Sequence, residues 1–183
     1  MAETKLSDSD VVAVEDYISN DVQLKKILEQ TSKVCHSLDW VIAGDIIRDS
    51  VWEQKYRKDM SKPDIGLVIH STRQVNVISL KEELVINCSG YGWDVVNCAE
   101  LGFDSIEDYI SLFPEVATCV GVTLDEFNRV SIVSPMSLGI RDLLDGVWRV
   151  NDNNPKATLE YFRDRTISKR IVERYPNVLI KFS

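Results

Sequence analysis

The chain lacks the features that mark membrane, secreted and zinc-stabilised proteins. No apolar run approaches the roughly 20 residues of a membrane-spanning helix, so we expect no membrane association. The first ten residues, MAETKLSDSD, are polar and acidic, unlike a secretory signal. The four cysteines form no CxxC pair and there are only two histidines, which excludes the usual zinc patterns. We therefore expect four reduced thiols in a cytoplasmic protein.

Basic residues are also scarce relative to acidic ones. The 183 residues include 21 Lys and Arg against 29 Asp and Glu, for a formal net charge of -8. Because nucleic-acid phosphates are bound by clustered Lys and Arg, strong nucleic-acid binding is not expected. A local basic patch or a metal ion could still hold a nucleotide.

The chain does contain short apolar strands that alternate with amphipathic helices. Strands are predicted at 40–43, 64–69, 93–97, 117–124 and 129–133, the last two as a hairpin around DEFN, with VLIKF as an edge strand. Helices are predicted from the cap at 7–10, at 21–37, 45–52, 80–86, 105–113 and 136–150, and from Pro155 onward. The basic stretch 55–63 is predicted to be a loop. This order indicates an α/β (α+β) fold with a small mixed sheet flanked by helices.

Two segments carry candidate chemistry. VIAGDIIRDSVW (41–52) predicts a strand that turns at Gly44 into a helix, and PDIGLVIH (63–70) predicts a strand with one acidic residue, Asp64. A glycine turn at a helix N-terminus favours phosphates, and carboxylates two residues apart on a strand can hold two divalent ions. Asp94 offers a further carboxylate from the next strand, but Gly66 stands where the second one is needed.

Asp45 follows the glycine turn and has two opposite interpretations. A carboxylate at the start of a helix would repel a bound phosphate, or it could simply stabilise the helix N-terminus. Downstream, Arg165 and Lys169 share a helix face through their spacing of four. With Arg48 and Arg149 they could form a phosphate-binding rim, although exposed salt bridges are the alternative for each.

These segments resemble a bacterial nucleotidyltransferase-like family of unassigned substrate, within the DNA polymerase beta-type superfamily. Three C-terminal segments carry the resemblance best: FPEVATCVGVTL (113–124), VSPMSLGIRDLLDGVWRVN (133–151) and RTISKRIVERYP (165–176). The similarity runs from about residue 21 to the end. It implies a nucleotidyltransferase-like domain over 21–183, with residues 1–20 as an N-terminal extension that we expect to be helical.

The resemblance also implies a site. It assigns the catalytic and metal-binding roles to Asp64 and Asp94, with Mg²⁺ as cofactor if the site is active, and NTP binding to Gly44, Asp45, Arg48 and Asn97. The departures from the family pattern fall on this site: Ala43 and Asp45 replace the glycines that flank the turn, and Gly66 replaces the second carboxylate. Loss of a metal-bridging carboxylate typically costs orders of magnitude in rate.

Three functions fit these observations. The first is a catalytically degenerate nucleotidyltransferase-like protein that binds a partner protein or a nucleotide. The second is an active Mg²⁺-dependent enzyme that moves NMP from an NTP to an unknown acceptor. The third is an acidic inhibitor or interaction protein, suggested by the net charge and by the acidic segments at 7–10 and 125–127.

Overall fold

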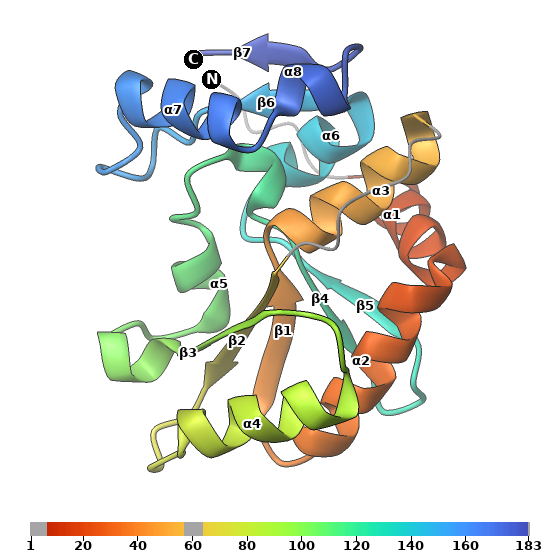
Figure 1. Ribbon diagram of the computed structural model, residues 1–183, viewed down its shortest axis with the longest axis vertical. Coiled ribbons are helices and arrows are strands. Elements are labelled where there is room, and N and C mark those ends of the chain that lie inside the picture. Colours follow the sequence, from red (N-terminus) through yellow and green to blue (C-terminus); the bar gives the residue numbers. More distant parts are fainter. Residues whose placement is uncertain (1–6, 57–63, 183) are drawn as a thin grey trace.

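A five-stranded mixed sheet forms the centre of the computed structural model, which describes residues 7–56 and 64–182 (Figure 1). Its strands are β1 (Asp39–Ala43), β2 (Ile65–His70), β3 (Trp93–Asn97), β4 (Gly121–Leu124) and β5 (Val130–Val133). The spatial order is β3-β2-β1-β4-β5. Strands β2 and β3 are parallel, and the other three neighbouring pairs are antiparallel. The predicted α/β class with a small mixed sheet is confirmed.

Helices surround this sheet, and a second, smaller sheet lies beside it. The helices are α1 (Asp8–Asn20), α2 (Val22–Val34), α3 (Asp45–Tyr56), α4 (Val77–Asn87), α5 (Ile106–Ile110), α6 (Ser137–Asp145), α7 (Leu159–Ser168) and α8 (Ile171–Arg174). Two 3₁₀ turns are η1 (Cys98–Leu101) and η2 (Val116–Thr118). The second sheet pairs β6 (Val147–Arg149) with β7 (Leu179–Lys181) in parallel.

The two faces of the five-stranded sheet are covered unequally. Because side chains alternate along a strand, Ile65, Leu67 and Ile69 of β2 point into the main core, to which α1 to α4 and α6 contribute. Val68 points to the other face, where a smaller cluster packs against Ile110 of α5. The second face is therefore covered by a short helix.

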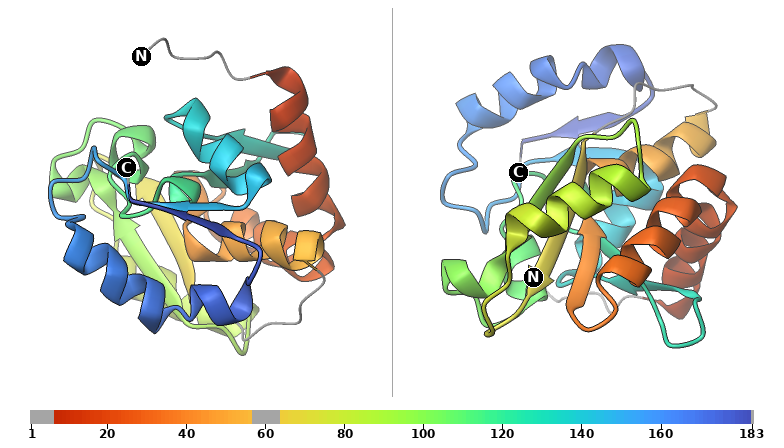
Figure 2. Two further views of the ribbon diagram at one scale, coloured as in Figure 1. Left: turned by 90° about the horizontal axis from the view of Figure 1, so that it is seen from above. Right: turned by 60° about the horizontal axis from the view of Figure 1, so that its bottom comes forward.

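The C-terminal segments close the end of the sheet where β1 runs into α3 (Figures 1 and 2). Trp148 of β6 stacks on Phe162 of α7, with ring centroids 5.9 Å apart, and meets the edge of Trp52 of α3 at 6.2 Å. Tyr175 adds a further edge contact to Trp52 at 5.1 Å. These aromatic contacts hold α7 and Tyr175, the residue that follows α8, against α3, the helix that begins at the glycine turn.

Local sequence signals predict several elements well. Strand β3 has the predicted bounds, and β4 and β5 form the expected hairpin around DEFN. Ser7 caps α1 and Ser105 caps α5 as predicted, since each hydroxyl accepts a hydrogen bond from a backbone N–H three residues on. The four tryptophans are buried in the core.

Three predictions were wrong. The helix expected over 136–150 ends at Asp145, because Gly146 adopts a left-handed conformation (φ +68°) and the next three residues pair with β7. No helix begins at Pro155; the asparagine-rich turns continue until Thr158 caps α7. The strand expected from Ala117 begins only at Gly121, since a 3₁₀ turn precedes it.

Three further expectations concern the ends and loops of the domain. The loop predicted at 55–63 lies outside the described residues beyond Tyr56. Helix α1 packs its fully buried Val14 and Ile18 into the main core, while the proposed division at residue 20 stays a prediction. In the described ranges, no helix has the length and apolarity needed to cross a membrane.

Candidate functional site

The glycine turn joins β1 to α3 as the sequence predicts. Gly44 has φ +89°, which disfavours side chains, and its carbonyl accepts hydrogen bonds from Ile47 N (3.2 Å) and Arg48 N (3.3 Å). A Cβ at Gly44 would lie 3.5 Å from Cε2 of Phe113, so this aromatic ring packs against the turn. The predicted turn is therefore present, but the ring of Phe113 already lies beside it.

Asp45, the first residue of α3, is held by cations from two helices. Its carboxylate accepts a 2.7 Å hydrogen bond from Nη1 of Arg48 and lies 2.5 Å from Nζ of Lys169. Nη2 of Arg165 is 4.0 Å away. A helix N-terminus lined with cations is where a phosphate would be favoured, and here the protein places its own carboxylate there.

The protonation of Asp45 reflects these cations. Burial alone would raise its pKa, but Arg48, Lys169 and Arg165 together lower the pKa to about 2 from 3.8. A depressed folded-state pKa adds stability that is present above pH 3.8 and is lost as the pH falls toward 2. At about 1.4 kcal/mol per pKa unit, the full contribution is about 2 kcal/mol.

Asp45→Asn should therefore reduce the acid sensitivity of the fold. Roughly half of the Asp45 contribution should be gone at pH 3, so wild type should lose about 1 kcal/mol more than the variant between pH 5 and pH 3. Urea unfolding at both pH values measures this difference. Asp164→Asn is the matched control, because that carboxylate is exposed and weakly paired. Identical pH dependence in wild type and Asp45→Asn would contradict the assignment.

Arg48 is fully buried and ties the start of α3 to the C-terminal segments. Its Nε and Nη2 donate to Oδ1 of Asp49 at 2.7 and 2.5 Å, in addition to the contact with Asp45. The guanidinium carbon lies 4.9 Å from the ring centroid of Trp148 and 5.6 Å from that of Trp52. Burial would lower the pKa of Arg48, but the two carboxylates raise it above its usual range. Arg48 thus interacts with two carboxylates and two tryptophan rings of the protein itself.

Two further carboxylates complete the ion-pair network. Asp49 is 2.9 Å from Nη2 of Arg174 and accepts a 3.1 Å hydrogen bond from the hydroxyl of Tyr175. Glu115, fully buried before η2, is paired with Nε of Arg165 and accepts from its Nη2 at 3.0 Å. Burial raises the pKa of Glu115, although Arg165 opposes this.

We call this group the ion-pair cluster. It consists of Asp45, Arg48, Asp49, Glu115, Arg165, Lys169 and Arg174. Four cations face three carboxylates, which leaves a formal charge of only one for an incoming anion. Its own carboxylates neutralise most of the positive charge of the cluster, unlike in a site that binds a triphosphate.

The carboxylates that were predicted to bind metal also depart from the family pattern. Asp64 precedes β2, and Asp94 lies in register with Gly66 on the neighbouring parallel strand, so both fall on the face of the sheet that carries Val68. The side chain of Asp64, however, lies against Gly92, where a Cβ would collide with its carboxylate. Over the described ranges, no three His, Cys, Asp or Glu residues converge as metal ligands. The residues present do not form the two-ion cage that the family pattern implies.

Gly66 closes the position of the absent carboxylate sterically. A Cβ there would lie 2.9 Å from the backbone oxygen of Ala43, its partner on β1. We expect Gly66→Asp to destabilise the fold by about 1–3 kcal/mol without creating Mg²⁺ binding. Thermal unfolding and Mg²⁺ titration measure the two effects, and Gly66→Ala separates the steric cost from the charge. Tight Mg²⁺ binding by Gly66→Asp would contradict this account.

Two predicted residues lie away from the ion-pair cluster. Asn97 is in register with Ile69, three positions along β3 from Asp94, and its side chain bonds Ser71 N (3.1 Å), Ser71 O (3.0 Å) and Glu100 (3.0 Å). Arg149 pairs with Asp142, with contacts of 2.7 and 3.0 Å. The structure thus brings Gly44, Asp45 and Arg48 together but separates Asn97 from them.

Sequence reasoning missed the carboxylates that neutralise the site. Asp49 and Glu115 were not singled out, although four basic residues around one buried turn require buried counter-charges. Their spacing along the chain has no periodic signal, since Glu115 and Arg165 are 50 residues apart. The sequence did single out Arg48, Arg165 and Lys169, either as a phosphate-binding rim or as salt-bridge partners.

Comparison with known proteins identifies the fold. A nucleotidyltransferase family model matches residues 30–180. A structure described as a CCA-adding enzyme head domain, determined by NMR, superposes with a TM-score of 0.77 at 19% identity, covering 99% of both chains. No curated protein matches the sequence.

Larger enzymes share this fold as part of their chains. The Thermotoga maritima CCA-adding enzyme complexed with tRNA gives a TM-score of 0.57 at 16% identity, and a CCA-adding enzyme with CTP gives the same values. They cover 95% and 94% of this chain but only 43% of their own. At these identities the similarity shows the fold alone, and the chain spans under half the length of these two enzymes.

Proposed function

The chain belongs to a nucleotidyltransferase family, and we propose that it is a catalytically degenerate member that acts by binding a protein partner. The carboxylate of Asp45 carries this proposal. This carboxylate pairs with Arg48, Lys169 and Arg165 at the helix N-terminus, where a nucleotide phosphate would have to bind. An incoming triphosphate would meet a negative charge and would have to displace buried ion pairs.

The metal side supports the same proposal. Nucleotidyl transfer relies on divalent ions to stabilise the charge on the transferred phosphate. Gly66 offers no ligand, and the nearby backbone oxygen of Ala43 leaves no room for a side chain there. The scaffold is kept while both halves of the site are changed, which favours a role in binding over one in transfer.

Titration of the purified protein with each NTP, with and without Mg²⁺, tests the proposal. We expect no Mg²⁺-dependent binding at micromolar affinity, and no transfer of NMP to water or to added RNA. Solved relatives are described in complex with CTP, ATP and tRNA, so CTP, ATP and tRNA should be included in the panel. Mg²⁺-dependent micromolar binding of any one nucleotide would overturn the proposal.

An active Mg²⁺-dependent transferase remains the alternative, because Asp64 and Asp94 share one face of the sheet. Asp64→Ala distinguishes the two. If nucleotide transfer is measured and this variant abolishes it with the fold intact, the enzyme function is correct. All four cysteines are free and buried, which supports the cytoplasmic location that we propose for either function.

A further inference from the structure

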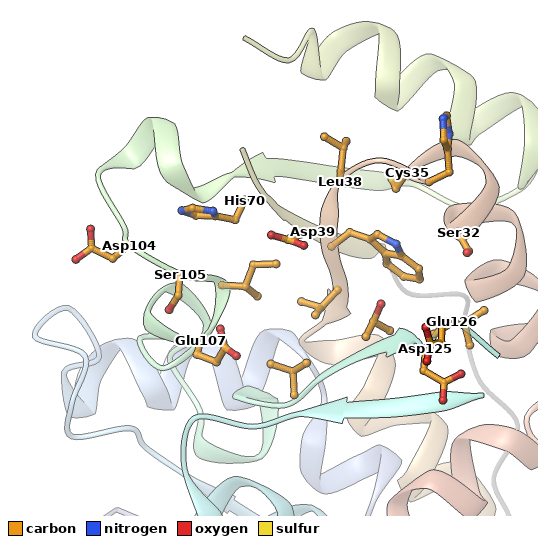
Figure 3. Close-up of a pocket in the computed structure, with 17 residues that line it drawn as sticks. Ser32, Cys35, Leu38, Asp39, His70, Asp104, Ser105, Glu107, Asp125 and Glu126 are labelled. Carbon is orange, nitrogen blue, oxygen red and sulfur yellow. The ribbon is translucent and has the colours of Figure 1, made fainter. Parts of the chain in front are cut away.

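A groove lies at the end of the sheet opposite the glycine turn. It encloses about 610 Å³, within the range of ligand-binding pockets, and sits where β1 begins and β2 ends (Figure 3). The end of α2, the start of α5 and the tip of the β4–β5 hairpin form its walls. None of these elements contributes to the ion-pair cluster.

The groove has an apolar floor and an acidic rim. The floor is formed by Leu38, Trp40, Val41, Ile106, Leu124 and Val133. Five carboxylates line it, those of Asp39, Asp104, Glu107, Asp125 and Glu126, and among the residues that the structure describes no Lys or Arg does. Figure 3 shows Asp104 and Glu107 on one side of the groove and Asp125 and Glu126 on the other.

Among the described residues, one of these five carboxylates is paired with a cation. Arg129 pairs with Asp125 at 2.7 Å. In the described ranges, no ion pair engages Asp104, Glu107 or Glu126, all of which are exposed. This contrasts with the other end of the sheet, where each buried carboxylate is held by a cation. The groove therefore presents uncompensated negative charge over apolar surface.

The hairpin tip beside the groove is pre-ordered. Oδ1 of Asp125 accepts hydrogen bonds from Phe127 N (2.8 Å) and Arg129 N (2.9 Å), and Asn128 adopts a left-handed conformation (φ +57°). This turn holds Phe127 with 68% of its surface exposed, next in sequence to Glu126. A rigid turn that displays an aromatic ring beside a groove costs little entropy on binding, which suits a protein interface.

We propose that this groove binds a basic segment of a partner protein, with its Lys or Arg side chains on the acidic rim and its aliphatic side chains on the floor. This rests on the proposed function in one respect, that the chain acts through a protein partner. A single metal ion does not fit, because no three His, Cys, Asp or Glu side chains converge in the described part of the chain. Carboxylates on opposite walls instead match an extended ligand that carries several positive charges.

A labelled six-residue peptide of alternating arginine and leucine is the probe. Fluorescence anisotropy should detect binding that weakens with salt, and amide chemical-shift changes should map to 32–39, 104–107 and 123–126. A peptide with serine in place of leucine should bind about tenfold more weakly if the apolar floor is used. A peptide with glutamate in place of arginine should not bind.

Glu107→Gln with Glu126→Gln should weaken arginine–leucine peptide binding about fivefold. Glu82→Gln with Glu160→Gln is the matched control, because it removes the same charge from exposed sites on α4 and α7 and should change affinity less than twofold. Equal weakening by both pairs, or no binding, would overturn the proposal. Spermine that competes at equal affinity would assign the groove to small polycations instead.

These outcomes are separate from the test of the proposed function. Peptide binding is read without nucleotide or Mg²⁺, so a positive transfer assay would overturn the degenerate assignment while leaving the groove intact. Concentration-dependent self-association that the Glu107→Gln and Glu126→Gln pair abolishes would replace the partner protein with a second copy of this chain, and would overturn the proposal as stated.

Discussion

Arg48→Met should lower the free energy of unfolding by about 3–5 kcal/mol, the usual cost of breaking a buried ion pair from one side. Methionine keeps much of the side-chain volume but removes every hydrogen bond that Arg48 donates to Asp49 and Asp45. Asp49 is only 2% exposed. It would retain Arg174 and Tyr175 as partners but lose Arg48, the closest of the three. The melting temperature should fall on the order of 10 °C for a domain of this size.

Urea and thermal unfolding measure this effect, and Arg163→Met provides the matched control. Arg163 is 66% exposed and lies 3.8 Å from Asp164, so its loss should cost less than about 1 kcal/mol. Arg48→Lys should not restore stability, because an ammonium cannot reproduce the planar contacts to two carboxylates and two indole rings. A loss below about 1 kcal/mol in Arg48→Met would show that the cluster relaxes without its central cation.

Much of the scaffold could be predicted because its signals are local. The serine cap of α1 and the DEFN hairpin each depend on residues within a few positions of one another. Strand β6 could not be predicted in this way, because Val147–Arg149 pairs with Leu179–Lys181, about 30 residues later. Val147–Arg149 follow α6 in sequence. They form a strand rather than a continuation of this helix because Gly146 is left-handed and because β7 pairs with them.

In the candidate site, too, the local features could be predicted from the sequence and the long-range contacts could not. The missing carboxylate at Gly66 is visible in the sequence, but the close backbone approach of Ala43 is a property of strand pairing. For Asp45 the sequence left two interpretations open, repulsion of a phosphate or stabilisation of the helix. The choice depends on Lys169, more than 120 residues away, which folds back onto it at 2.5 Å. Long-range ion pairs of this kind have no local pattern from which they could be predicted.

Asp45→Ala should create the anion site that wild type lacks. Removing the carboxylate frees Lys169, which is 38% exposed, to face the N-terminus of α3, while Arg165, which is 24% exposed, stays paired with Glu115. The formal charge of the ion-pair cluster rises from one to two, and space opens where the carboxylate was. We expect inorganic tripolyphosphate to bind at least tenfold more tightly than to wild type, a change of about 1.4 kcal/mol or more.

Isothermal titration with tripolyphosphate, without metal, measures this gain. Asp45→Ala combined with Lys169→Gln should reverse it, because the cation that the change exposes is then absent. Asp125→Asn is the control for simple charge removal: it releases Arg129 at the hairpin tip, far from the glycine turn, and should leave affinity unchanged. If wild type already binds tripolyphosphate as tightly as Asp45→Ala, Asp45 does not block the site, and a nucleotide-binding role would have to be considered for the native protein. If only Asp45→Ala binds, one carboxylate keeps a nucleotidyltransferase scaffold from holding phosphate.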